Sequence, residues 1–227
     1  MLSRAKNGKA AGVDRVQLEL LKSADCIVPH LTRLCSVQHA MAARSYPHRL
    51  EKGKRHPSIQ KADLSECSNW RGITLLSVPG KVFSKALLNH MQDAVDQLLR
   101  QQQACLRPGR SCADQIFSLR QIIEKVTEGQ RPVIVNFIDF RKAFDCIHRP
   151  ALWKILKLYG LPKKIITIIQ KLYEESSSAV KIDGDVSSWF QVVTGVRQGC
   201  ILSPLLFAIT IDWVMRKTTR FYALFFT

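Results

Sequence analysis

Apolar residues are most concentrated between Val133 and Ile138, where the run VIVNFI is interrupted only by Asn136. Most of these residues are β-branched, and a continuous apolar run of this length is typical of a strand buried on both faces. We therefore predict a buried central strand at 133–138 that leads directly into Asp139.

Helical spacing of apolar residues, with recognisable end signals, accounts for much of the remaining chain. Ser77 and Pro79 supply an N-cap and a first-turn proline for one helix, and Ser111 supplies the N-cap of another. In this second helix we expect a core-facing apolar stripe, formed by Ile116, Leu119, Ile122, Ile123 and Val126. The helices are expected at residues 14–22, 29–43, 80–101, 112–128, 153–159, 163–173 and 203–215.

The other segments are predicted to be strands and a loop. Arg71 is followed by a short apolar strand, and strands at 180–182 and 189–193 flank Asp183-Gly184-Asp185, which is typical of a hairpin turn. Residues 45–62 are polar and basic and contain two prolines, so their composition alone predicts a loop.

Asp139 is the residue that this pattern singles out for chemistry. A carboxylate at the end of a buried strand needs a cation or hydrogen bonds to offset its desolvation, which makes Asp139 a candidate metal ligand. Asp is also a preferred N-cap, so the position of Asp139 alone fits a cap of the next helix equally well.

The charge balance indicates a polyanionic partner. The chain carries 34 Lys and Arg against 18 Asp and Glu, a net charge of +16, and the phosphate backbone of RNA or DNA is the commonest such partner. An acidic membrane surface is the alternative. No window reaches the roughly 20 apolar residues of a membrane span, and the basic residues are spread along the chain, so we expect no membrane partner.

Cysteine and histidine spacing gives no sign of a structural metal. The seven cysteines and six histidines include no CxxC or HxxxH pair, so a zinc site is not expected. Residues 1–11 lack the apolar core of a signal peptide. We therefore expect reduced thiols and an intracellular location, in the nucleus, the cytoplasm or both.

Two segments carry a family resemblance, FIDFRKAFD at 137–145 and GVRQGCILSP at 195–204. In this order and spacing they resemble the reverse transcriptases of non-LTR (LINE-type) retrotransposons. Earlier blocks of the same enzymes are similar to NWRGITLLSVPGKVFSKALLNHM at 69–91, RPGRSCADQ at 107–115 and KAAGVD at 9–14.

The resemblance implies an α+β fold, part of a right-hand polymerase in which helices pack a small, mainly antiparallel sheet. Residues 1–219 are expected to form a partial reverse transcriptase domain, with 1–130 mainly fingers and 131–219 mainly palm, including a hairpin at 178–193. Residues 220–227 are then a tail outside the family.

The resemblance also implies roles in two-metal nucleotidyl transfer. Asp139 is expected to bind Mg²⁺, with Mn²⁺ as a substitute, helped by the carbonyl of Phe140. Arg71 is expected to lie over the triphosphate of the incoming nucleotide. The ring of Phe144 corresponds to the aromatic under the sugar, where it leaves no room for a 2′-hydroxyl and selects deoxynucleotides.

Further residues are implied to contact nucleic acid or shape the nucleotide pocket. Gln198 and Gly199 match residues that shape this pocket and let the template strand approach. Arg197 is a candidate contact to nucleic acid, as are Arg107 and Arg110, for which a solvated basic turn is an equal alternative. The implied partners are an RNA template, a DNA primer and a dNTP.

The sequence also departs from the family's wording. Ala11 and Arg15 replace a proline and a glycine in the opening block, which removes turn-forming residues. The strand that relatives carry within 45–62 has lost most of its apolar residues, which puts a role of Lys61 in holding triphosphate in doubt.

The Tyr-x-Asp-Asp motif, which carries the family's other catalytic carboxylates, does not follow the second motif in this sequence. Asp145 and Asp212 fall in predicted helices and are interpreted as polar-face residues. With Asp139 alone we expect weak magnesium binding and little polymerase activity. The hypotheses are a partial reverse transcriptase domain that acts within a longer protein, a non-catalytic nucleic-acid-binding relic, and a chain that folds poorly because strand edges stay open.

Overall fold

The computed structural model describes residues 69–218 except 106, 175, 183 and 184, and the backbone of 53–59. It also describes short pieces at 7–8, 11, 14–23, 26, 29 and 65. Most of the predicted helix at 29–43, Lys61 and the tail at 220–227 lie outside the described residues. Within the part that is described, no helix is long and apolar enough to cross a membrane.

Most helices begin close to the predicted positions, but the helices expected from 14 and from 153 begin at Leu18 and at Arg149. Ser77 caps α4 by accepting a hydrogen bond from the Gly80 backbone, and Ser111 forms a capping box with Asp114 at the start of α5. The helices are α1 (Leu18–Ser23), α4 (Val78–Leu98), α5 (Cys112–Glu128), α6 (Arg149–Leu158), α7 (Lys163–Glu174) and α8 (Ser203–Thr218).

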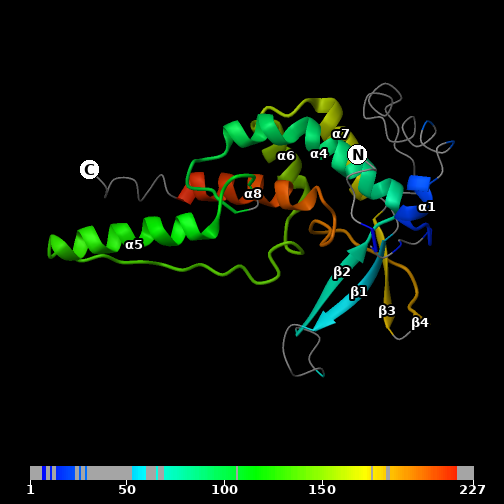
Figure 1. Ribbon diagram of the computed structural model, residues 1–227, viewed down its shortest axis with the longest axis horizontal. Coiled ribbons are helices and arrows are strands. Elements are labelled where there is room, and N and C mark those ends of the chain that lie inside the picture. The colour runs from blue at the N-terminus through cyan, green and yellow to red at the C-terminus, as the bar shows by residue number, and fades with distance from the viewer. Residues whose placement is uncertain are drawn as a thin grey trace.

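Four of these helices, α4, α6, α7 and α8, pack into one layer that holds the main core (Figure 1). Each contributes apolar side chains that are less than 2% exposed: Phe83 and Leu87 from α4, Leu152 and Leu156 from α6, Ile169 from α7, and Leu206 and Ile209 from α8. Burial of such side chains is the main stabilising contribution to a domain of this size. This layer is the rigid base on which the rest of the chain is arranged.

A five-stranded, mainly antiparallel sheet lies beside the helical layer (Figure 1). Its path is β2 (Trp70–Leu75), β1 (Gly53–Ile59), β3 (Ser177–Ile182) and β4 (Asp185–Val186), and β5 (Phe190–Gln191) pairs with β3. The β1–β3 pair is parallel, whereas the other three pairs are antiparallel. The coarse expectation of an α+β fold with helices against a small sheet is therefore confirmed.

The prediction of a loop at 45–62 is wrong for residues 53–59, which form β1. This strand pairs with β2 from Lys54 opposite Leu75 to Ile59 opposite Trp70, and with β3 on its other side. Strand formation depends strongly on neighbouring strands, so backbone pairing on both sides outweighs a polar composition. Composition alone contains no information about these neighbours.

The predicted central strand at 133–138 is also wrong, because residues 131–140 have no regular structure and are exposed. Ile134 is 87% exposed and Phe137 is 85% exposed. The predicted core stripe of α5 fails with it: no residue of α5 is buried, and Figure 1 shows this helix projecting from the helical layer. An apolar run becomes a buried strand only where other segments cover it, and none of the described segments covers this run.

Asp212 contradicts its interpretation as a polar-face residue, because its side chain is fully buried in α8. Its carboxylate accepts hydrogen bonds from Arg100 Nε (3.1 Å), Arg216 Nε (2.7 Å) and the Tyr159 hydroxyl (2.6 Å). Burial alone would raise the pKa of Asp212, but these hydrogen bonds outweigh it and hold the pKa below its usual value. Burial and the same carboxylate raise the pKa of Tyr159 to about 12. Asp212 thus joins α6, α8 and the end of α4.

Asp212→Asn is expected to lower the free energy of unfolding by about 2–3 kcal/mol near neutral pH, because two guanidinium groups lose their charged acceptor. The folded pKa lies below the unfolded value of about 3.9. The stabilisation is therefore present above about pH 4 and is lost as the pH falls through the folded pKa. Urea unfolding at neutral and acidic pH measures this, with Asp93→Asn, an exposed position on α4, as the control. If the loss of unfolding free energy in Asp212→Asn were as large at acidic pH as at neutral pH, the negative charge of Asp212 would not be its cause.

Backbone amides of residues 133–140 are expected to exchange with solvent nearly as fast as in an unfolded chain, whereas amides of α8 are protected. The described backbone hydrogen bonds include none donated by residues 133–140. Hydrogen exchange followed by mass spectrometry compares the two segments directly. Strong protection of 133–140 would restore the buried strand predicted from the sequence.

Candidate functional site

A cleft of 530 Å³ lies where β2, the turn after residue 140, the loop at 195–200 and the start of α8 meet. The structure thereby brings together most of the residues that the resemblance singled out. They are Arg71 from β2, Phe140 and Phe144 from the turn, and Arg197, Gln198 and Gly199 from the loop. Segments that are far apart in the sequence therefore converge on one cleft.

Two glycines allow the loop to approach its neighbours closely. A Cβ on Gly199, which has φ +98°, would lie 2.5 Å from the Thr74 carbonyl oxygen of β2. A Cβ on Gly195, with φ +73°, would lie 2.6 Å from the Asp145 carbonyl oxygen. The Thr74 amide donates to the Gln198 carbonyl (2.7 Å), and the Val196 amide donates to the Phe144 carbonyl (2.8 Å). Only residues without a side chain fit at these two contacts.

One wall of the cleft is aromatic. Phe144 stacks on Phe207 of α8, with ring centroids 4.7 Å apart and an angle of 16° between the ring planes. Both rings are half-buried against the main core. Phe140 is 47% exposed at the cleft. Arg71 and Lys142 are exposed and bring positive charge to the same cleft.

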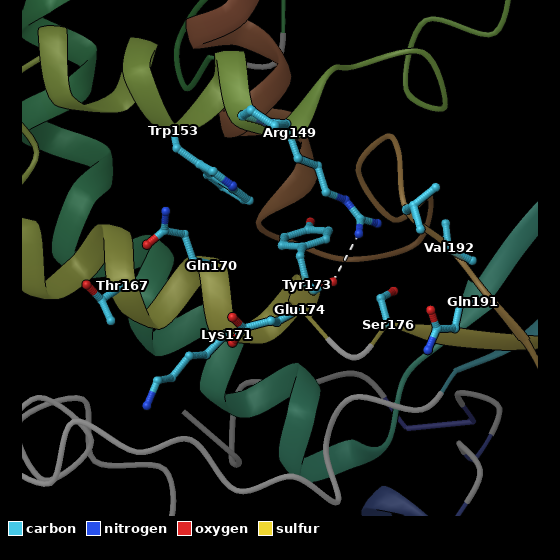
Figure 2. Close-up of a pocket in the computed structure, with 12 residues that line it drawn as sticks. Arg149, Trp153, Thr167, Gln170, Lys171, Tyr173, Glu174, Ser176, Gln191 and Val192 are labelled. Carbon is cyan, nitrogen blue, oxygen red and sulfur yellow. Dashed lines mark hydrogen bonds between the residues drawn. The ribbon is translucent and has the colours of Figure 1, made fainter.

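Two buried arginines hold the loop against the end of α7. Arg149 donates to the carbonyls of Gly195 (3.0 Å), Thr194 (3.2 Å) and Tyr173 (3.0 Å), and Arg197 donates to the Leu172 carbonyl (2.7 Å) and to Ser176. Both guanidinium groups lie over the Tyr173 ring, at 5.0 and 5.3 Å from its centroid. Figure 2 shows Arg149 above this ring in a second pocket, of 410 Å³, which is next to Trp153. Burial raises the pKa of Tyr173 to about 12, so the ring remains neutral between the two cations.

Arg197 is only 6% exposed, and its guanidinium bonds to the protein interior although the residue borders the cleft. Arg107 is similarly engaged: it donates to both carboxylate oxygens of Asp96 (2.7 and 3.0 Å), and this interaction lowers the pKa of Asp96. Neither Arg107 nor Arg110 lines the cleft. Arg110 lies exposed in the basic turn. The geometry therefore gives Arg107 and Arg197 structural contacts and leaves Arg110 open to a partner.

Asp139 lies in the exposed segment 131–140 and does not line the cleft, although its neighbour Phe140 does. The carboxylate that does line it belongs to Asp145. Among the described residues no group of three or more His, Cys, Asp or Glu side chains is arranged to hold a metal ion. Asp139 is thus not part of a cluster of three or more such side chains in the part of the chain that the structure describes.

Comparison with known proteins decides the family. The family described as "Reverse transcriptase (RNA-dependent DNA polymerase)" matches residues 59–226, well over half of the chain. The chain belongs to this reverse transcriptase family. The predicted resemblance to the reverse transcriptases of non-LTR, LINE-type elements is confirmed by the names of the relatives.

The relatives of this reverse transcriptase chain are proteins of transposable elements. It is 27% identical over 153 residues to "Transposon TX1 uncharacterized 149 kDa protein" from Xenopus laevis. The matched region covers 67% of this chain and 12% of the relative. It is 27% identical over 148 residues to the "Retrovirus-related Pol polyprotein from type-2 retrotransposable element R2DM" of Drosophila melanogaster, covering 65% and 14%. The "Putative 115 kDa protein in type-1 retrotransposable element R1DM" of the same species is 24% identical over 225 residues, covering 95% and 21%. The chain therefore spans only about an eighth to a fifth of the length of these relatives.

Sequence reasoning did not single out several residues that line the cleft. Asp145, interpreted as a helical polar-face residue, lies in an irregular turn at the cleft, so that interpretation is wrong. Trp70, Lys142 and Phe207 also line the cleft. The sequence signal that could have found them is their place within or beside the motifs. Trp70 precedes Arg71, and Lys142 and Asp145 lie on either side of Phe144. Phe207 follows Ser203-Pro204 by one helical turn.

Gly199→Ala is expected to lower the free energy of unfolding by about 2–4 kcal/mol, because it adds a steric clash with β2 to the cost of a positive φ. Gly109→Ala is the matched control. Gly109 has φ +69° and no atom within 4 Å of an added Cβ, so it reports the cost of the backbone conformation alone. Urea unfolding of both variants measures the difference, and equal costs would contradict the close contact of the loop with β2.

Proposed function

We propose that this chain is the part of a LINE-type reverse transcriptase that binds the incoming nucleotide and the primer–template, with fingers and palm elements on either side of the cleft. We further propose that the chain by itself is catalytically incomplete. The observation that carries the first proposal is the convergence of Arg71, Phe144 and Gln198 on one cleft of 530 Å³. Three separate sequence motifs meet there, in a space of the size of a nucleotide site.

The chemistry of the cleft suits a nucleoside triphosphate. Arg71 offers a planar fork of donors that matches phosphate oxygens, and Lys142 adds a second cation at the same cleft. The ring of Phe144 offers an apolar surface for the sugar. Gln198 presents an amide for hydrogen bonds to the nucleotide. The net charge of +16 suits an RNA template and a DNA primer, whose phosphates bind basic domains with strong salt dependence.

The family implies divalent metal ions, and the described residues do not fit a two-metal centre. Bridging two ions requires several carboxylates at one place. Here Asp139 lies on an exposed segment and Asp145 stands in the cleft, with no cluster of three ligand side chains in the described part. The absence of such a cluster among the described residues supports the proposal of catalytic incompleteness. We derive no chemical step through Mg²⁺ or Mn²⁺ for this chain.

The same observation favours a second candidate function, a non-catalytic RNA- or DNA-binding protein that retains the cleft and the basic surface. Binding of nucleic acid needs the cations and the rings but no carboxylate cluster. In that case Asp139→Ala would leave binding unchanged. The two candidates differ in whether a dNTP enters the cleft.

Arg71→Ala is expected to weaken binding of dTTP to the protein in complex with poly(rA)/oligo(dT) by about 10- to 100-fold, as for the loss of a charge-assisted hydrogen bond. Equilibrium titration of the complex with labelled dTTP measures the affinity, and a salt series on the complex itself should show weaker binding at higher salt. Arg120→Ala is the matched control, since Arg120 is 75% exposed on α5 and away from the cleft.

Two results would contradict the proposal. If dTTP does not bind, or binds equally well to wild type and Arg71→Ala, the cleft is not the nucleotide site. Primer extension with the same substrates tests incompleteness: little or no extension is expected from wild type. Efficient extension that Asp139→Ala abolishes would show that a working set of carboxylates forms after all.

A further inference from the structure

The ring of Phe144 rests on Phe207 and not on its own segment. The backbone around Phe144 is an irregular turn, which the Val196 amide and the close contact with Gly195 hold in place through main-chain atoms. These contacts fix the Cα position of Phe144 but leave its side-chain torsions open. The ring of Phe144 makes a nearly parallel stack with the ring of Phe207, with the ring centroids 4.7 Å apart.

Phe207 itself stands on a rigid base. It lies in the second turn of the 16-residue α8, and its neighbours Leu206 and Ile209 are completely buried in the main core. A stacked pair of aromatic rings is more stable than its buried area alone explains, because the offset of the two rings is favourable. The orientation of Phe207 is thus set by the core, and the stack on Phe207 holds the ring of Phe144, which also packs against the edge of the core.

The two rings together form an apolar wall of the cleft. A deoxyribose packed on this wall buries carbon against carbon. A ribose placed in the same way brings its 2′-hydroxyl against a surface that offers no hydrogen-bond partner, so the hydroxyl loses water without replacement. The wall discriminates only while the Phe144 ring keeps its place, since a rotated ring would admit water or the hydroxyl.

We infer that Phe207 is a positioning residue for sugar selection: its ring holds Phe144 in the orientation that favours deoxynucleotides over ribonucleotides. This inference rests on the proposed function, because it requires a nucleotide in the cleft. It adds to that function a residue outside the motif that carries Phe144, on a different element of the fold.

The test compares the affinities of dTTP and of 5-methyl-UTP, the ribonucleotide with the same base, for the poly(rA)/oligo(dT) complex of wild type, Phe207→Ala, Phe207→Leu and Phe207→Tyr. Phe207→Ala is expected to reduce the dTTP preference by about 2- to 10-fold, the range that the loss of one aromatic pair corresponds to. Phe207→Leu keeps most of the volume without a ring and should also lose preference, whereas Phe207→Tyr keeps the stack and should retain it. Phe117→Ala, at a 63% exposed phenylalanine of α5, is the control that removes a ring elsewhere.

The possible outcomes distinguish failure of the inference about Phe207 from failure of the proposed function. Loss of preference in the Ala and Leu variants, with retention in the Tyr and control variants, supports the inference. A dTTP preference that is unchanged in folded Phe207→Leu overturns it while the cleft remains the nucleotide site. Absence of nucleotide binding in wild type overturns the proposed function and the inference with it. If circular dichroism shows that Phe207→Ala is unfolded, the comparison of Leu with Tyr decides.

Discussion

The close approach of the loop at 195–200 to β2 and to the turn at 144–145 is the contact on which the cleft depends. The loop leads into α8, and its main-chain atoms contact both the sheet and the irregular turn. Main-chain atoms can meet this closely only where no Cβ intervenes, which is the case at Gly195 and Gly199. Without this contact, Arg71 on β2 would not be held next to Phe144 of the turn and Gln198 of the loop, and the three residues would not form one site.

Positive charge in this protein serves two purposes that the net charge does not distinguish. Arg149 and Arg197 are buried, and their described partners include main-chain carbonyls at the end of α7 and in the loop. Arg107, Arg100 and Arg216 are engaged with Asp96 and Asp212. Arg71, Lys142 and Arg110 are exposed to solvent. A total of +16 therefore overstates the charge that is available to phosphates, since several arginines hold the fold together.

The sequence predicted the elements whose signals are local. Caps at Ser77 and Ser111 located the starts of α4 and α5 because a cap is decided within four residues. Features that depend on distant segments were not predictable: β1 needs β2 and β3 beside it, and the run at 133–138 needs a cover that its own composition does not supply. Burial of Asp212 followed the same rule, since Arg100 lies more than a hundred residues away.

The residues of the candidate site were named from sequence motifs and not from the periodic spacing of apolar residues. Gln198, Gly199 and Phe144 lie together because one motif forms a loop, the other forms a turn, and the loop and the turn meet. The spacing of apolar residues gave no information about this meeting. Phe207 and Asp145 escaped because each looks like an ordinary helix residue when its neighbours in space are unknown.

Because the loop docks through its backbone, its attachment to β2 does not depend on the side chain at position 198. The Thr74 amide binds the carbonyl of Gln198 and not its amide side chain, so the contact that assembles the cleft is indifferent to which side chain stands at 198. Substitutions there can change what the cleft recognises while the attachment to β2 is conserved. The architecture thus leaves substrate preference open to variation at little cost to folding, and it confines the strict requirement for one residue type to the two glycines.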